Sequence, residues 1–137
     1  SRVQRLIFCS GKVYYDLVAA RKHVGKEDSV AIARVEQLSP FPYDQVLEES
    51  VKFQRAEIVW AQEEHKNMGG WTFVQPRFNS LLATAQVAGA GRSISYAGRL
   101  PSSSPATGNK YTHLQEQKDM LSKTLDVPKS ALEGFKA

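Results

Sequence analysis

The stretch EIVWAQEEHKNMGGW, from Glu57 to Trp71, decides the fold of the chain. Its apolar part, IVWA, ends abruptly in QEEH, and turn residues that include two glycines follow. A short apolar run bounded by turn residues predicts a buried strand, and the carboxylates cannot enter the core without losing their hydration. We therefore expect the polar cluster at the carboxyl end of this strand, the edge where ligands and partner surfaces gather in open α/β sheets.

Three further segments, residues 3–9, 30–35 and 93–98, have the apolar composition of strands. Four helices are predicted between and after the strands, the last one beginning at a capping box of Thr112 and Gln115. Their apolar positions are Val13, Leu17, Ala20 and Val24, then Tyr43, Val46, Leu47 and Val51, then Val74, Phe78, Leu81 and Ala85, and finally Leu114, Leu121 and Leu125. Strands that alternate with helices imply parallel pairing, so the predicted fold is a three-layer α/β domain with a mostly parallel sheet and helices on both faces.

The 137 residues suit a single domain over residues 1–137, in which the tail 126–137 has too few apolar residues for a structural prediction. The composition, 42% apolar and 23% charged, is that of a folded globular protein. The net charge of +4 is dispersed along the chain, which argues against nucleic acid as a partner. No apolar run approaches a membrane span of about 20 residues. The single cysteine, Cys9, forms no internal disulfide, and because the chain opens directly into a strand we expect it to be part of a longer protein.

The cluster Glu63, Glu64 and His65 has two interpretations. A carboxylate can orient a histidine that moves a proton, which would make the cluster an acid–base or metal site. The two histidines at helical spacing that would support a zinc site are missing, however. We favour an ionic surface, formed with Asn67 and Trp71, that docks a neighbouring domain or subunit.

The turn Ser10-Gly11-Lys12 between the first strand and the first helix is a candidate anion site. Free backbone N–H groups and the positive end of a helix dipole attract anions, and the lysine adds a full charge. The long loop before the last helix could bring further groups to the same edge, namely Arg99, Ser103, Thr107 and Lys110. Together they could hold the phosphates of a nucleotide or of coenzyme A, although the glycine spacing of a phosphate loop is absent and a plain solvated loop stays open as an alternative.

Ordered motifs across the chain resemble a known family. They are FCSGKVYYDL from Phe8, EQLSPFP from Glu36, QEEH with Asn67 and Gly69, YAGR from Tyr96, and SPATG from Ser104 followed by His113. These motifs resemble the C-terminal domain of the 2-oxoglutarate dehydrogenases, the thiamine-dependent first components of the 2-oxoglutarate dehydrogenase complex. The connection from Val87 to Gly91 departs from the shorter one of that family, and the last twelve residues match it poorly.

This resemblance implies a transketolase C-terminal-like domain of a homodimeric enzyme of the tricarboxylic acid cycle. The parent enzyme would decarboxylate 2-oxoglutarate on thiamine diphosphate and magnesium and transfer the succinyl unit to a lipoyl group on a succinyltransferase partner. It would work in the mitochondrial matrix of a eukaryote or the cytoplasm of a bacterium. No catalytic, cofactor or metal residue is expected here, so the chain alone should be inactive.

The resemblance assigns the chain subunit assembly and, in some members, an allosteric acetyl-coenzyme A site. For that site we take the six residues named above for phosphates: Ser10, Lys12, Arg99, Ser103, Thr107 and Lys110. The alternative function is an autonomous effector module that binds a nucleotide or coenzyme A.

Overall fold

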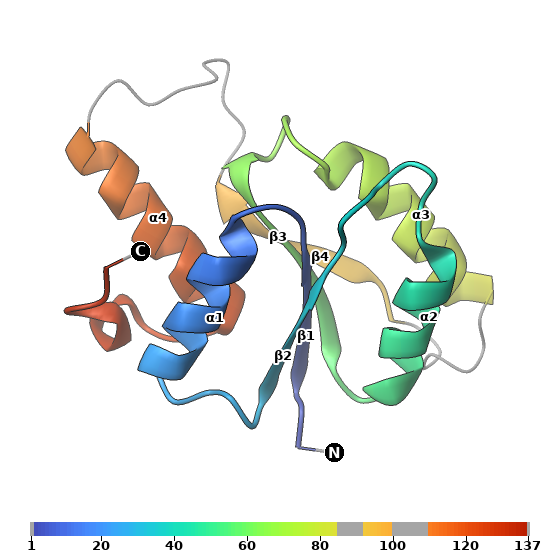
Figure 1. The fold of residues 1–137 in the computed structure, drawn as a ribbon, viewed down its shortest axis with the longest axis horizontal. Helices are drawn as coiled ribbons and strands as arrows, with labels where there is room; N and C mark the ends of the chain where they lie inside the picture. The colour runs from blue at the N-terminus through green and yellow to red at the C-terminus, as the bar shows by residue number, and fades with distance from the viewer. Residues whose placement is uncertain (1, 85–91, 100–109, 137) are drawn as a thin grey trace.

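The computed structural model describes residues 2–84, 92–99 and 110–136, and in these ranges four strands alternate with four α-helices (Figure 1). In chain order the elements are β1 (Arg5–Cys9), α1 (Val13–His23), β2 (Val30–Arg34), α2 (Tyr43–Lys52), β3 (Glu57–His65), α3 (Trp71–Thr84), β4 (Ile94–Arg99) and α4 (Lys110–Leu125), followed by the short 3-10 helix η2 (Lys129–Leu132).

The strands form one parallel sheet in the order β2-β1-β3-β4. Leu6 of β1 lies beside Ala31 of β2 on one side and beside Ile58 of β3 on the other. Figure 1 shows α2 and α3 on one face of the sheet and α1 and α4 on the other. The predicted α/β fold with a parallel sheet and helices on both faces is therefore confirmed.

The central strands bury side chains on both faces, which explains why their sequences are apolar without alternation. In β1, Leu6 and Phe8 belong to the cluster beneath α2 and α3, and Ile7 and Cys9 belong to the cluster beneath α1 and α4. The helices fill the first cluster with Val46, Val74, Phe78 and Leu82, and the second with Val13, Leu17, Ala20, Met120, Leu121 and Leu125.

Three details of the helices differ from the sequence prediction. Tyr43 is 46% exposed because it opens α2 and only stacks edge-on against Phe41, with ring centroids 4.8 Å apart. Leu114 is 52% exposed, whereas the buried residue one turn further along α4 is Gln117. The last helix begins at Lys110, so the predicted capping box lies inside the helix and does not start it.

The tail after α4 contributes to the core. Leu132 of η2 is fully buried in the cluster beneath α1 and α4. Phe135 stacks near His23 of α1, with ring centroids 5.5 Å apart, and Lys26 Nζ donates a hydrogen bond to the carbonyl of Asp126 at 3.1 Å. Two isolated apolar residues thus anchor a segment for which composition gave no prediction.

The strand order creates a switch point between β1 and β3. The helices that follow these neighbouring strands, α1 and α3, lie on opposite faces of the sheet (Figure 1). The turns at the carboxyl ends of β1 and β3 consequently diverge, and this divergence is where open α/β sheets form their sites.

Candidate functional site

The register of β3 against β4 shifts near the carboxyl ends of both strands. Gln62 pairs with Gly98, but the next pair is His65 with Arg99. The two residues of β3 in between, both glutamates, have no partner residue in β4. An irregularity of this kind interrupts regular pairing and re-aims side chains at the rim of a sheet. It places both glutamates at the edge where the sequence predicted the polar cluster.

The side chain of Gln62 organises the turn after β3. Its amide oxygen accepts hydrogen bonds from Trp60 Nε1 at 2.9 Å and from the backbone N–H of Trp71 at 3.0 Å. Its amide nitrogen donates to the carbonyls of Met68 at 2.7 Å and His65 at 2.9 Å. Gln62 is only 3% exposed, so this buried amide is fully paired and fixes the start of α3 against the end of β3.

Two glycines allow the chain to pass closely around this amide. Gly69 has φ +69°, and a Cβ there would lie 3.2 Å from Gln62 Oε1. A Cβ at Gly98 would lie 2.6 Å from the hydroxyl of Tyr96. That hydroxyl donates a hydrogen bond to the carbonyl of Arg99 at 2.6 Å, and burial raises the pKa of Tyr96 to about 12, so the group stays a donor at neutral pH.

The turn after β1 meets the glutamates across the switch point. Lys12 Nζ lies 3.9 Å from Glu63 Oε1, which confirms that the Ser10-Gly11-Lys12 turn and the QEEH cluster share one edge. Gln117 of α4 joins them by donating a hydrogen bond from Nε2 to Asp16 Oδ2 at 3.2 Å. Burial raises the pKa of Glu63, the charge of Lys12 opposes the rise, and a hydrogen bond with Asp16 adds to it.

A second ionic group fixes α4 over the ends of β3 and β4. Glu116 Oε2 lies 3.5 Å from Arg99 Nη1 and 4.0 Å from His65 Nε2. The side chains of Arg99 and His65 are only 9% and 10% exposed, so removing their acidic partner would leave polar groups with little access to water.

The structure divides the five residues predicted to face a neighbouring domain. Glu63 contacts Lys12, just before α1, and His65 contacts Glu116 of α4, so both are engaged within the chain. Glu64 and Asn67 are exposed at the tip of the turn, and Trp71 is half-buried against the ring of the β4 tyrosine. We call these last three the β3 tip; its role as an interface stays a prediction.

The predicted effector residues are only partly described. Ser103 and Thr107 lie outside the described residues, and for Lys110 only the backbone is described. The side chain of Lys12 is 79% exposed, whereas that of Arg99 is engaged with an acidic partner from α4. An anion at this edge would have to compete with that carboxylate, and effector binding by these residues stays a prediction.

The groups of this edge are engaged mainly with one another. Within residues 2–84, 92–99 and 110–136, no three His, Cys, Asp or Glu side chains are grouped so that they could hold a metal ion. No helix in those ranges is long and apolar enough to cross a membrane. Burial raises the pKa of the Cys9 thiol to about 12, which leaves it unreactive at neutral pH.

Sequence reasoning missed the residues that other elements bring to this edge. These are Asp16 of α1, Tyr96 of β4, and Glu116 and Gln117 of α4. Only Gln117 left a signal, because it is a polar residue at a helix position that the apolar spacing predicts to be buried.

The fold and the site together define a class. The chain is an open parallel α/β domain whose switch point is occupied by its own ion pairs and hydrogen bonds, with a small exposed tip beyond them.

Comparison with known proteins identifies the family. Residues 1–125 match the family described as 2-oxoglutarate dehydrogenase C-terminal. The chain belongs to this family and is a 2-oxoglutarate dehydrogenase C-terminal domain.

The relatives are much longer than this chain. It is 73% identical over 135 residues to the mitochondrial 2-oxoglutarate dehydrogenase of Caenorhabditis briggsae, a match that covers 98% of this chain and 13% of the relative. It is 51% identical over 133 residues to the mitochondrial 2-oxoglutarate dehydrogenase-like protein of Rattus norvegicus, covering 97% and 12%. It is 44% identical over 116 residues to the 2-oxoglutarate dehydrogenase E1 component of Brucella anthropi, covering 85% and 11%. The chain thus spans about an eighth of the length of these relatives.

Proposed function

We propose that this chain is the assembly domain of a thiamine-dependent 2-oxoglutarate dehydrogenase and that it presents the β3 tip to a neighbouring domain or to the second subunit of a homodimer. Family membership, with relatives roughly eight times longer, supports a parent enzyme. The parent would decarboxylate 2-oxoglutarate and transfer the succinyl unit to a lipoyl group on a succinyltransferase partner, in the tricarboxylic acid cycle. The mitochondrial names of the eukaryotic relatives support a place in the matrix, and the bacterial relative supports a cytoplasmic counterpart.

The proposal rests on a difference between neighbouring residues at this edge: some are paired within the chain, and others are exposed at the tip. Because Glu63 and His65 are held by partners inside the chain, the exposed Glu64 and Asn67 sit on a turn that is rigid before any partner arrives. A preorganised surface loses less conformational entropy on binding than a flexible one. Trp71, the half-buried member of the tip, adds an aromatic anchor of the kind enriched in interfaces.

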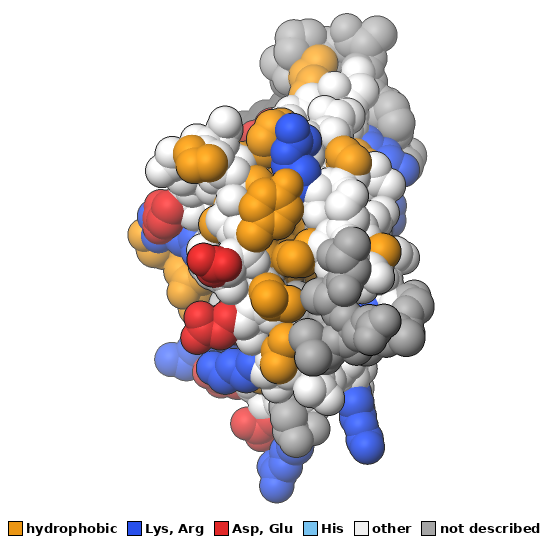
Figure 2. Space-filling model, turned by 90° about the vertical axis from the view of Figure 1, so that its right-hand side faces the viewer, with side chains coloured by type: hydrophobic (Ala, Val, Ile, Leu, Met, Phe, Trp, Pro, Cys, Tyr) orange, Lys and Arg blue, Asp and Glu red, His pale blue; other side chains and the backbone are white. Residues whose placement is uncertain are grey.

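The side of the molecule beside α2 and α3 supports an extended contact. Figure 2 shows a band of hydrophobic side chains on this side, flanked by acidic and basic ones. Half-buried members of the cluster beneath these helices are Leu38, Trp71, Phe73 and Leu81. Apolar area with a charged rim is the composition of a domain interface.

We place catalysis outside this chain. Thiamine diphosphate and magnesium would bind in the other domains of the parent. This domain would fix the relative positions of those domains and of the two subunits. The isolated chain would therefore have no turnover with 2-oxoglutarate.

The test is a charge reversal at the tip in the full-length enzyme. Glu64→Lys should raise the dissociation constant of the dimer by about fivefold or more. The new positive charge would face a partner surface that is complementary to a carboxylate. Analytical ultracentrifugation gives the dissociation constant, and specific activity should fall in parallel.

The matched control is Glu27→Lys, at an exposed position in the turn before β2, which lies at the amino ends of the strands and away from both the tip and the α2–α3 side. It should leave both dimer affinity and activity unchanged. A Glu64→Lys enzyme with the dimer affinity and activity of the unmodified enzyme would contradict an assembly role for the tip.

A further inference from the structure

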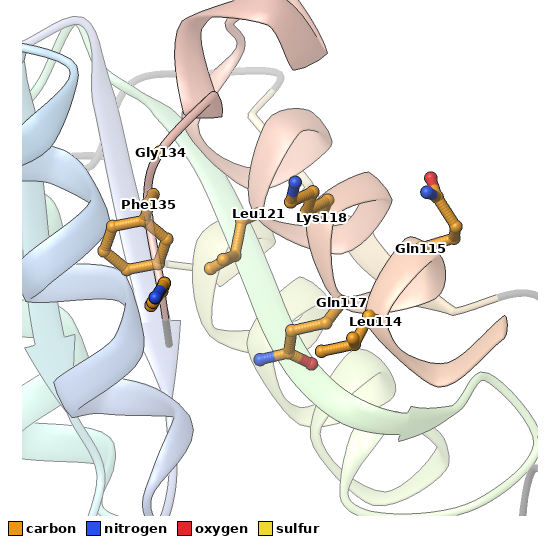
Figure 3. Close-up of a pocket in the computed structure, with 8 residues that line it drawn as sticks. Leu114, Gln115, Gln117, Lys118, Leu121, Gly134 and Phe135 are labelled. Carbon is orange, nitrogen blue, oxygen red and sulfur yellow. The ribbon is translucent and has the colours of Figure 1, made fainter. Parts of the chain in front are cut away.

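A groove lies between α4 and the last residues of the described chain. Leu121 forms its floor, Phe135 forms the opposite wall, and Leu114 extends the apolar lining toward the solvent. Figure 3 shows Leu121 pointing from α4 toward Phe135. The groove has a volume of about 590 Å³, within the range of small-molecule sites.

The charged residues in the described lining of this groove have one sign. Lys118 and Lys136 line it, and no carboxylate is among its lining residues. Within the described residues, neither lysine forms an ion pair. The acidic residues nearby on α4 already have basic partners: Glu116 pairs with Arg99, and Asp119 pairs with Lys129. An apolar lining with two unpaired ammonium groups is complementary to a ligand with an apolar body and a negative head.

We propose that this groove binds a small amphipathic carboxylate, with its hydrocarbon body between Leu121 and Phe135 and its carboxylate at Lys118 and Lys136. The size of the groove favours such a molecule over an acidic peptide, because a stable protein contact needs about 800 Å² from each partner. The groove is also distinct from the β3 tip, so the proposal stands apart from the assembly function.

A molecule bound in this groove would affect the carboxyl edge of the sheet through a single residue, Gln117. Gln117 lines the groove and also donates a hydrogen bond to Asp16 at 3.2 Å. Occupation of the groove should therefore shift the resonances of the Gln117 side-chain amide and the Asp16 backbone amide as well as those of the groove itself.

The experiment titrates the 137-residue chain with decanoate, followed by calorimetry and by 1H–15N NMR. Decanol, which has the same body without the charge, and decyltrimethylammonium, which has the opposite charge, are the probe controls. Saturable decanoate binding, with decanol and the cation weaker by about tenfold or more, is the expected result. Equal binding of all three probes, or no saturable binding of decanoate, would overturn the proposal.

The variant arm replaces both lysines, Lys118→Glu with Lys136→Glu, and compares the product with Lys52→Glu on α2. All three positions are on the surface, and circular dichroism checks that each variant is folded. Decanoate affinity should fall about tenfold in the double variant and stay unchanged in the control. Unchanged affinity in the double variant overturns the site. Binding of an acidic amphipathic peptide in place of decanoate overturns the assignment of the ligand class.

Discussion

The side chain of Gln62 links the end of β3 to the start of α3. It is the residue whose loss should damage the site most, because its amide satisfies the indole of Trp60 and several backbone groups in a place that water does not reach. A buried donor or acceptor that loses its partner costs about 1–3 kcal/mol.

Replacement of this amide by a hydrocarbon of similar size should therefore be strongly destabilising. Gln62→Leu should lower the free energy of unfolding by about 2–4 kcal/mol, measured by urea denaturation. Gln75→Leu, at an exposed position of α3, is the matched control and should change it by less than about 0.5 kcal/mol. An equal loss of unfolding free energy in the two variants would show that the hydrogen bonds of Gln62 do not stabilise the turn.

Glu63 makes the stability of the chain depend on pH. Its pKa is raised in the folded state, chiefly by burial, so the folded protein holds this proton more tightly than the unfolded chain does. Stability is then lost as the pH rises from the ordinary glutamate pKa through the raised one.

An amide at this position imitates the protonated carboxyl group. Glu63→Gln should accordingly raise the melting temperature near pH 7, and the gain should vanish below about pH 4, where the wild-type side chain is itself protonated. The control, Glu48→Gln on the exposed face of α2, should show no such dependence. If wild type melts higher than Glu63→Gln near pH 7, the attraction of Lys12 outweighs burial and the stated direction is wrong.

At the residue scale, sequence reasoning succeeded where the signal was local. The apolar run before QEEH placed the polar cluster at the carboxyl end of β3 correctly. The strand nevertheless continues through QEEH to His65 and buries Gln62 and His65, so only the two glutamates keep access to water. Sequence reasoning failed for Asp16, Glu116 and Gln117, because these residues reach the edge through helix packing, which no short stretch of sequence encodes.

At the scale of elements, α2 depends on a side chain from a distant part of the chain. Arg92, just before β4, donates to the carbonyls of Ser50 at 2.8 Å, Phe53 at 2.9 Å and Ala56 at 3.0 Å. These carbonyls lie at and beyond the carboxyl end of the helix, where a cation is favoured by the helix dipole.

Removing that guanidinium should loosen the end of α2 locally. Arg92→Met should cost about 1–2 kcal/mol of stability and speed hydrogen exchange across residues 50–56, since three carbonyls there lose a part-buried donor. Arg55→Met, at an exposed arginine in the same segment, serves as the control. Exchange that accelerates equally in both variants would remove the capping role from Arg92.

The elements themselves were largely predictable, and their ends were less so. Continuous apolar runs gave the strands, because the central strands of a parallel sheet covered on both faces bury most of their residues. Helix starts were harder to place: Thr112 looked like a cap, yet α4 already begins at Lys110. Capping preferences amount to about 1 kcal/mol and yield to packing when the two disagree.

At the scale of the whole molecule, the tail shows what composition alone misses. Residues 126–136 have few apolar side chains, yet Leu132 is fully buried and Phe135 packs against the cluster beneath α1 and α4. Strands and helices alternate along the entire chain. This alternation predicts the parallel sheet and brings the turns after β1 and β3 to the same edge. Packing of the tail depends on the positions of a few single side chains in the folded chain. A local sequence pattern does not give those positions.

The central claim concerns the β3 tip in the assembled parent enzyme. Hydrogen–deuterium exchange of the backbone amides of residues 63–67 should be compared between the 137-residue chain and the full-length enzyme. The exposed Glu27 and Asp28, in the turn before β2, serve as an internal reference. The account predicts exchange about tenfold slower or more at the tip in the full-length enzyme, with little change at the reference. Identical exchange rates at the tip in both proteins would contradict it.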